Sequence, residues 1–322
     1  MKHFIKFALI LSLVLVILGS ICCTVSFGIG FNYSDFWQDV EEGKYSFGPI
    51  SEVGEAIWRN GDNWRDDGVN WKSASTNEYA FPWNGEGDER ITGLDLDVYY
   101  GKVRMEESNS NEVQVIVEYR KKNHRRKVEA YNDGGILKIE ETGSKRSRNN
   151  DSTRITIGIP SEMMEEEHIL EAISLRQDAG AIYTDIPLRA EKISINVNAG
   201  ECLAYEKLTA LREFSADVGA GEIDLQAVEA PEVTLNADVG QIDTETITAD
   251  DLYIDCGIGS IDAQVCGKEQ DYNYEVSCSM GEVSIGDHDF HAISAKKEID
   301  NSADKTMRVD CNIGQVDVSF DD

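Results

Sequence analysis

Apolar and polar residues alternate through the second half of the chain in a short unit that recurs around glycine. In the copy around Gly240, apolar or small residues stand seven, five, three and one positions before the glycine and two and four positions after it. A period of two is typical of a strand with one buried face, and the change of phase predicts a corner at the glycine. We therefore expect a strand on each side of the glycine, with φ > 0 at Gly240 itself.

The unit recurs often enough to predict an architecture. From Gly180 onward the glycines are 20, 19, 21, 19, 22 and 33 residues apart. This spacing indicates one solenoid coil per repeat, with an insertion in the last interval. The predicted fold is all-β, a parallel β-solenoid with coils of about 20 residues. One copy carries two extra residues, so that its second strand restarts at Gly221. The glycines expected at corners are Gly101, Gly180, Gly200, Gly219, Gly221, Gly240, Gly259, Gly281 and Gly314.

The N-terminus has the pattern of a membrane anchor. Lys2 and Lys6 precede an uncharged stretch of 19 residues, 7–25, which is long enough as a helix to cross a bilayer core. A cleaved secretory signal is one alternative, and lipidation near Cys22 is another. We expect residues 1–28 to form a retained transmembrane helix. The N-terminus would then be cytoplasmic and the rest of the chain extracytoplasmic, in the cell envelope.

Residues 29–90 lack a sustained period and are rich in Gly, Asn, Asp and Glu. We interpret them as an acidic, tryptophan-rich stalk whose aromatic rings rest at the lipid headgroups or cover the first coil. A glycan-binding platform is the alternative. The five tryptophans of the chain all lie here: Trp37, Trp58, Trp64, Trp71 and Trp83.

The folded part is expected to begin with a first coil around Gly101 and an antiparallel meander, together spanning residues 91–160. A β-solenoid then occupies residues 161–322. A turn signal stands at Asn132-Asp133-Gly134-Gly135. The strand-like runs of the meander are 112–119, 135–141 and 153–159.

Charge is distributed unevenly. The chain carries a net charge of −30, which argues against nucleic acid as a partner. Residues 120–154 nevertheless hold 11 basic and 5 acidic residues, whereas 155–322 hold 10 and 36. The hypothesis is a contact with anionic lipid or wall polymer. The alternative is a solvated hairpin that leans on the acidic solenoid. The residues of this basic cluster are Arg120, Lys121, Lys122, Arg125, Arg126 and Lys127.

Carboxylates recur in the repeat. Four aspartates stand three residues after a glycine of the repeat: Asp224, Asp243, Asp262 and Asp317. Three more stand two residues before such a glycine: Asp178, Asp217 and Asp238. Stacked carboxylates repel, and a divalent cation could relieve this, so a cation-binding surface protein is one alternative. The calcium nonapeptide is absent, however, and the favoured interpretation is a solvated rim with no metal or cofactor.

The cysteines and histidines give weaker signals. Cys256, Cys278 and Cys311 share the inward position three residues before the glycine, where they are expected to pack as small apolar side chains or, alternatively, to form a disulfide between rungs. His288 and His291 are close in sequence but lack a third metal ligand.

No catalytic motif occurs in the sequence. A carbohydrate-active β-helix enzyme is the alternative that a deep cleft lined by Asp and Arg would favour.

Several of these features together resemble a known family. Over roughly residues 91–320 the chain resembles the bacterial putative-adhesin family of β-strand-repeat domains of unknown function. The features that carry this resemblance are the run 94–105, the segment Ile157-Gly158-Ile159-Pro160 and the serial Gly-x-Ile/Val-Asp units. The resemblance implies a membrane-tethered, extracytoplasmic β-solenoid connected with surface adhesion or envelope stress, and it provides no catalytic residues. We therefore expect a non-enzymatic envelope protein that is anchored in the membrane and has envelope proteins as partners.

Overall fold

The computed structural model describes residues 75–119, 126–143 and 153–321. All the described residues belong to one compact unit. No helix in the described ranges is long and apolar enough to cross a bilayer, and the anchor expected over residues 1–28 lies outside them.

The described part consists of strands joined by short turns, as predicted for an all-β chain. The strands are β1 (Ser75–Pro82), β2 (Gly93–Ser108), β3 (Glu112–Tyr119), β4 (Arg126–Asp133), β5 (Ile136–Gly143), β6 (Thr153–Pro160), β7 (Leu170–Thr184), β8 (Leu188–Glu229), β9 (Glu232–Thr248), β10 (Asp251–Cys266), β11 (Tyr272–Ile285), β12 (His288–Ile299) and β13 (Lys305–Asp321). Single 3₁₀ turns are η2 (Gly87–Glu89), η3 (Ser161–Met164) and η4 (Glu269–Asp271).

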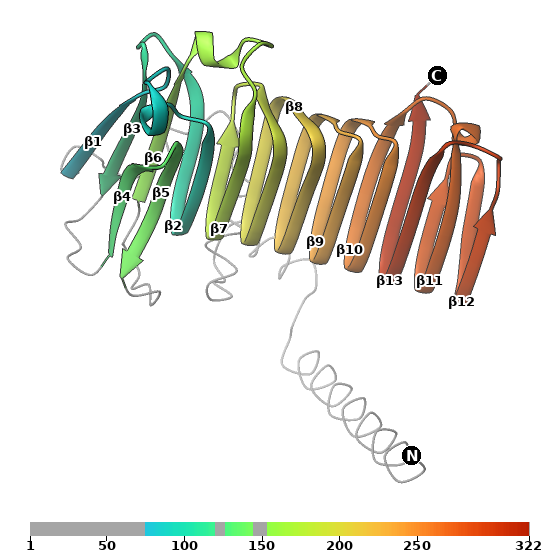
Figure 1. Ribbon diagram of the computed structural model, residues 1–322. Helices are drawn as coiled ribbons and strands as arrows, with labels where there is room; N and C mark the ends of the chain where they lie inside the picture. Colours follow the sequence, from blue (N-terminus) through green and yellow to red (C-terminus); the bar gives the residue numbers. More distant parts are fainter. Residues whose placement is uncertain (1–74, 120–125, 144–152, 322) are drawn as a thin grey trace, which may run out of the picture. The chain divides into compact units, whose positions relative to one another are not determined.

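The long strands are the coils of the predicted solenoid (Figure 1). Each coil runs toward a corner, turns at its glycine and returns as a second arm. β8, with 42 residues, contains two such coils, around Gly200 and Gly221. Neighbouring coils pair in parallel and in register, with Gly101 opposite Gly180, Gly180 opposite Gly200 and Gly240 opposite Gly259. Register is strict because a shift of one residue would turn the apolar side chains outward.

A single hydrophobic core lies between the two sets of arms. In β9, for example, Val233, Leu235, Ala237 and Ile242 are at most 2% exposed and point inward from either side of the corner. Corresponding residues of the other coils stack above and below them in one cluster that continues from Trp83 to Val318. Each fully buried aliphatic side chain contributes about 1.5–3 kcal/mol of transfer free energy, so stacking stabilises coils that could not fold alone.

The coils do not stack in chain order at the C-terminal end. β13 inserts between β10 and β11, and it pairs in parallel with both. The insertion expected between Gly281 and Gly314 contains β12, which returns antiparallel along β11 and covers that end of the ladder. The last two coils therefore stack out of chain order, which the repeat spacing does not specify.

The N-terminal end is more integrated than an isolated meander. β5 pairs in parallel with the first arm of β2, and β6 pairs in parallel with the second arm. Antiparallel strands β4, β3 and β1 extend these two layers. β1 and Trp83, which is 7% exposed, lie in the segment expected as a stalk, so the folded part begins well before residue 90.

The corner glycines form one column along the solenoid. At Gly259, φ is +152° and a Cβ would lie 1.9 Å from the carbonyl oxygen of Gly240. Positive φ was expected at Gly240 too, and this is wrong, because φ there is outside the left-handed range. Gly240 is required for close approach instead, since its Cβ would lie 2.6 Å from the Gly221 oxygen. Gly219 also stands outside the column, and Gly221 takes its place. In spatial order the column is Gly101, Gly180, Gly200, Gly221, Gly240, Gly259, Gly314 and Gly281.

Candidate interaction surfaces

The residue before each corner glycine forms an exposed apolar ridge in the last four coils. Val239, Ile258, Ile313 and Met280 are 53%, 49%, 47% and 62% exposed. Val239 is in register with Ile258, and Ile258 with Ile313, so the side chains follow one another along the corner. They matched the apolar pattern of the repeat and were expected to be buried, which is wrong. The backbones approach so closely at the corner that this side chain is turned outward.

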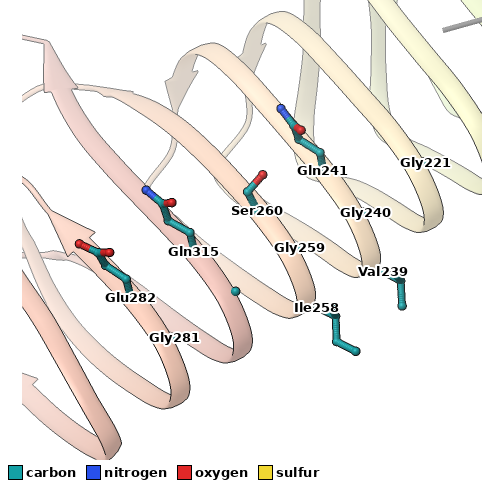
Figure 2. A pocket seen from close by; sticks show the side chains of 11 residues that line it. Gly221, Val239, Gly240, Gln241, Ile258, Gly259, Ser260, Gly281, Glu282 and Gln315 are labelled. Carbon is teal, nitrogen blue, oxygen red and sulfur yellow. The ribbon is translucent and has the colours of Figure 1, made fainter. Parts of the chain in front are cut away.

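An open groove of about 830 Å³ runs along the corner beside this ridge. Figure 2 shows Val239 and Ile258 pointing to one side of the bend, whereas Gln241, Ser260 and Gln315 point to the other. The corner glycines form the floor, and Glu282 is the one ionisable side chain among the residues that line the groove. The enzyme alternative called for a deep cleft lined by Asp and Arg, and this groove is not of that kind.

A column of four carboxylates lies on the outer face of the second arms. Asp224, Asp243, Asp262 and Asp317 are opposite one another in successive coils. Partial burial, a hydrogen bond with Asp243 and the charges of Asp243 and Asp317 raise the pKa of Asp262 to about 6. Burial and the same neighbour raise the pKa of Asp224. Asp262 therefore takes up its proton near pH 6, well above the usual range of an aspartate.

The other Asp positions do not form one column. Asp217 is opposite Asn236, which donates a 2.6 Å hydrogen bond to it. Asp178 likewise accepts a hydrogen bond from Asn198 at 2.8 Å. Within the described ranges no group of three or more His, Cys, Asp or Glu side chains could hold a metal ion.

Replacing Asp262 with Asn should stabilise the fold at pH 7.5. The raised pKa means that the folded protein binds this proton more tightly than the unfolded chain, whose Asp has a pKa near 3.8. Wild-type stability should therefore rise as the pH falls from about 7 to 4. Asp262→Asn should remove much of this rise and add about 1 kcal/mol to the free energy of unfolding at pH 7.5, an estimate reduced because the carboxylate is exposed.

The measurement is urea denaturation at pH values from 4 to 8. Asp304→Asn is the matched control, because it removes the same charge from an exposed position outside the column. An equal gain in both variants would indicate an effect of net charge alone.

Three cysteines stack in the core near the end of the ladder. Cys256 is opposite Cys311, which is opposite Cys278, and all are at most 2% exposed. They are free thiols. Burial, followed by the charges of its two neighbours, raises the pKa of Cys311 to about 12. The inward position was predicted correctly, and these thiols pack as small apolar groups.

The histidine pair and the basic cluster were also candidate sites. His288 lies in β12, where its Nδ1 is 2.7 Å from a carboxylate oxygen of Glu269. Residues 120–125 of the basic cluster lie outside the described residues. Arg126 begins β4, and Lys127 forms an ion pair with Glu129. Binding of the cluster to an anionic surface stays a prediction.

Comparisons place this architecture in a family. The sequence profile of Toastrack DUF4097 matches residues 91–263, so the chain belongs to that family. This confirms the resemblance drawn from the repeats, and the family fold is β-solenoid-like. A comparison with curated proteins gives no match.

Several solved structures are similar to the chain. A putative adhesin from Bacteroides fragilis NCTC 9343 is 15% identical with a TM-score of 0.42, over 77% of this chain and 97% of that one. A putative cell adhesion protein from Clostridium sporogenes ATCC 15579 is 13% identical with a TM-score of 0.31, over 77% and 100%. A putative adhesin from Parabacteroides merdae ATCC 43184 is 11% identical with a TM-score of 0.34, over 77% and 96%.

Proposed function

We propose that the protein is a non-enzymatic interaction protein of the cell envelope, tethered to the membrane by residues 1–28, and that it binds a partner protein along the corner ridge. The observation that carries this proposal is the ridge of Val239, Ile258, Ile313 and Met280. Single exposed apolar residues are ordinary on protein surfaces, but a continuous row of them is typical of interaction sites.

The surroundings of the ridge support a protein partner. Three of its four neighbours across the corner, Gln241, Ser260 and Gln315, are uncharged, and the fourth is Glu282. Residues 155–322 as a whole carry a large excess of acidic groups. Interface cores are depleted in charged residues and rich in aliphatic and aromatic ones. The rigid coil-to-coil spacing holds the four side chains in place, so that a partner would bind without much loss of conformational entropy in this chain.

The tether rests on sequence. Lys2 and Lys6 and the uncharged run 7–25 have the composition of a single-pass anchor with a cytoplasmic N-terminus. The high net negative charge of the remaining chain would keep a domain outside the membrane soluble, which fits the proposed tether.

Photo-crosslinking in the native host tests the proposal. A photo-reactive phenylalanine analogue in place of Ile258 should give an adduct of discrete mass, at least tenfold more abundant than the same analogue in place of Glu232. Glu232 is also exposed, but it lies at the start of β9, away from the corner. Adding Ile313→Asp to the Ile258 probe should remove the adduct, with little change in melting temperature because Ile313 is exposed.

Equal adducts from the two probe positions would rule out the ridge as the binding surface. In the same cells the protein should sediment with membranes and be cut by protease added outside. Full protection from that protease would contradict the extracytoplasmic location.

A further inference from the structure

The corner ridge presents one apolar side chain per coil along the axis of the ladder. Its members follow the order of the stacked coils, with Val239 in β9, Ile258 in β10, Ile313 in β13 and Met280 in β11. Adjacent coils are about 4.8 Å apart, so the ridge extends over about 14 Å. A partner that binds the whole ridge must present apolar groups at nearly the same interval.

The backbone of the ridge does not offer an edge to an added strand. Val239 is paired with Ile258, which is paired with Ile313, and the glycines that follow them are paired as well. An extended peptide that gains affinity by main-chain hydrogen bonds needs a free sheet edge. An α-helix does not, because its backbone groups bond to one another.

The period of an amphipathic helix also matches the spacing of the coils. Apolar residues three and four apart on a helix stand on average about 5.3 Å apart along its axis, at a rise of about 1.5 Å per residue. Over the three steps of the ridge the mismatch with the coil spacing accumulates to only about 1.4 Å. A helix of about ten residues can therefore contact all four side chains.

The groove beside the ridge has room for such a helix. Val239 and Ile258 stand on one side of the groove, and Gln241 and Ser260 stand on the other (Figure 2). The floor consists of the corner glycines, which have no side chain to hold a helix away from the backbone.

Carboxylates flank the corner on both sides. Asp238 is exposed immediately before Val239, at the end of the first arm of β9. Asp262 is exposed on the second arm of β10, in the column of four carboxylates between Asp243 and Asp317. An apolar strip between two acidic flanks is complementary to an apolar stripe with basic residues on either side.

We propose that the partner contributes an amphipathic α-helix that lies along the ridge, parallel to the ladder axis, with its apolar stripe on the ridge and lysine or arginine residues on both flanks. This inference rests on the proposed function, because it specifies the kind of protein segment that the ridge binds. An extended segment in the same direction would advance about 3.3 Å per residue, and a segment that crosses the ridge would contact a single coil.

Photo-crosslinking from successive coils measures the conformation of the bound segment. The photo-reactive phenylalanine analogue is placed in turn at Val239, Ile258 and Ile313 of the full chain in the native host. Mass spectrometry then locates the cross-linked residue of the partner. For a helix this residue should advance by about three or four positions from each coil to the next, since about 4.8 Å is covered at about 1.5 Å per residue.

The other outcomes separate this inference from the proposed function. An advance of about one or two residues per coil would indicate an extended segment. The same partner residue at all three probe positions would indicate a segment that crosses the ridge. Either result would overturn the helix and leave the proposed function standing. No adduct from any of the three positions would overturn the proposed function, and this inference with it.

Charge reversal tests the basic flanks. Asp238→Lys combined with Asp262→Lys should lower the yield of the adduct from the Ile258 probe at least tenfold. Glu232→Lys combined with Asp304→Lys is the matched control, because it makes the same change in net charge at exposed positions away from the corner, and it should leave the yield within twofold. An unchanged yield in the first pair, or an equal loss in both pairs, would overturn the basic flanks.

Discussion

Gly259→Ala is expected to lower the free energy of unfolding by about 4 kcal/mol or more, although it adds a single methyl group. The new Cβ would lie 1.9 Å from the Gly240 carbonyl oxygen, far inside contact distance. That oxygen belongs to the backbone of the neighbouring coil, so relief requires the two coils to separate. The φ of +152° at Gly259 adds backbone strain for any other residue.

Two controls separate these causes. Gly87 also has positive φ, at +60°, but a Cβ there would meet nothing within 4 Å, so Gly87→Ala should cost only about 1 kcal/mol. Gly240→Ala, with its closest contact at 2.6 Å and no positive φ, should fall between the two. Denaturant titration at constant pH measures all three. A loss at Gly259 no larger than that at Gly87 would contradict the close approach of the corners.

Val316→Asp is the second change with a large expected effect, again about 4 kcal/mol or more. Val316 is fully buried in β13, between Ile261 of β10 and Val283 of β11. An aspartate there would place an unpaired carboxylate in the core. Gln315→Asp is the matched control because it adds the same charge at the exposed neighbour, and it should change stability little.

The strands in which Val316→Asp accelerates amide hydrogen exchange test the position of β13 directly. Hydrogen exchange should accelerate in both β10 and β11, since both pair with β13. Accelerated exchange restricted to β11, β12 and β13, with β10 unaffected, would instead indicate that β11 packs on β10 and that the coils stack in chain order.

The sequence predicted the solenoid because each coil repeats the same alternation around a glycine. It could not predict the order of the last coils. β11 and β13 both have cysteine three residues before the glycine and valine two residues after it, so the buried positions alone fit either coil beside β10. The antiparallel return of β12 along β11, which no local pattern specifies, distinguishes them.

The candidate surfaces show a similar limit. Ile258 has the same hydrophobicity as a core residue, and only the geometry of the corner turns it outward. The Asp column followed from spacing alone, because parallel pairing in register brings equivalent residues together. β1 was missed, although Tyr79 and Phe81 alternate in its sequence and pack against the core.

The position of β13 also determines when the molecule can be completed. A ribosome delivers β11 and β12 before the 17 residues of β13, so β10 keeps an unpaired edge until β13 has been synthesised. Earlier coils can add one by one, but this end must close in a single late step. Until then the open edge of β10 is a site for mispairing with other chains, and a chain cut before β13 lacks the strand that joins β10 to β11.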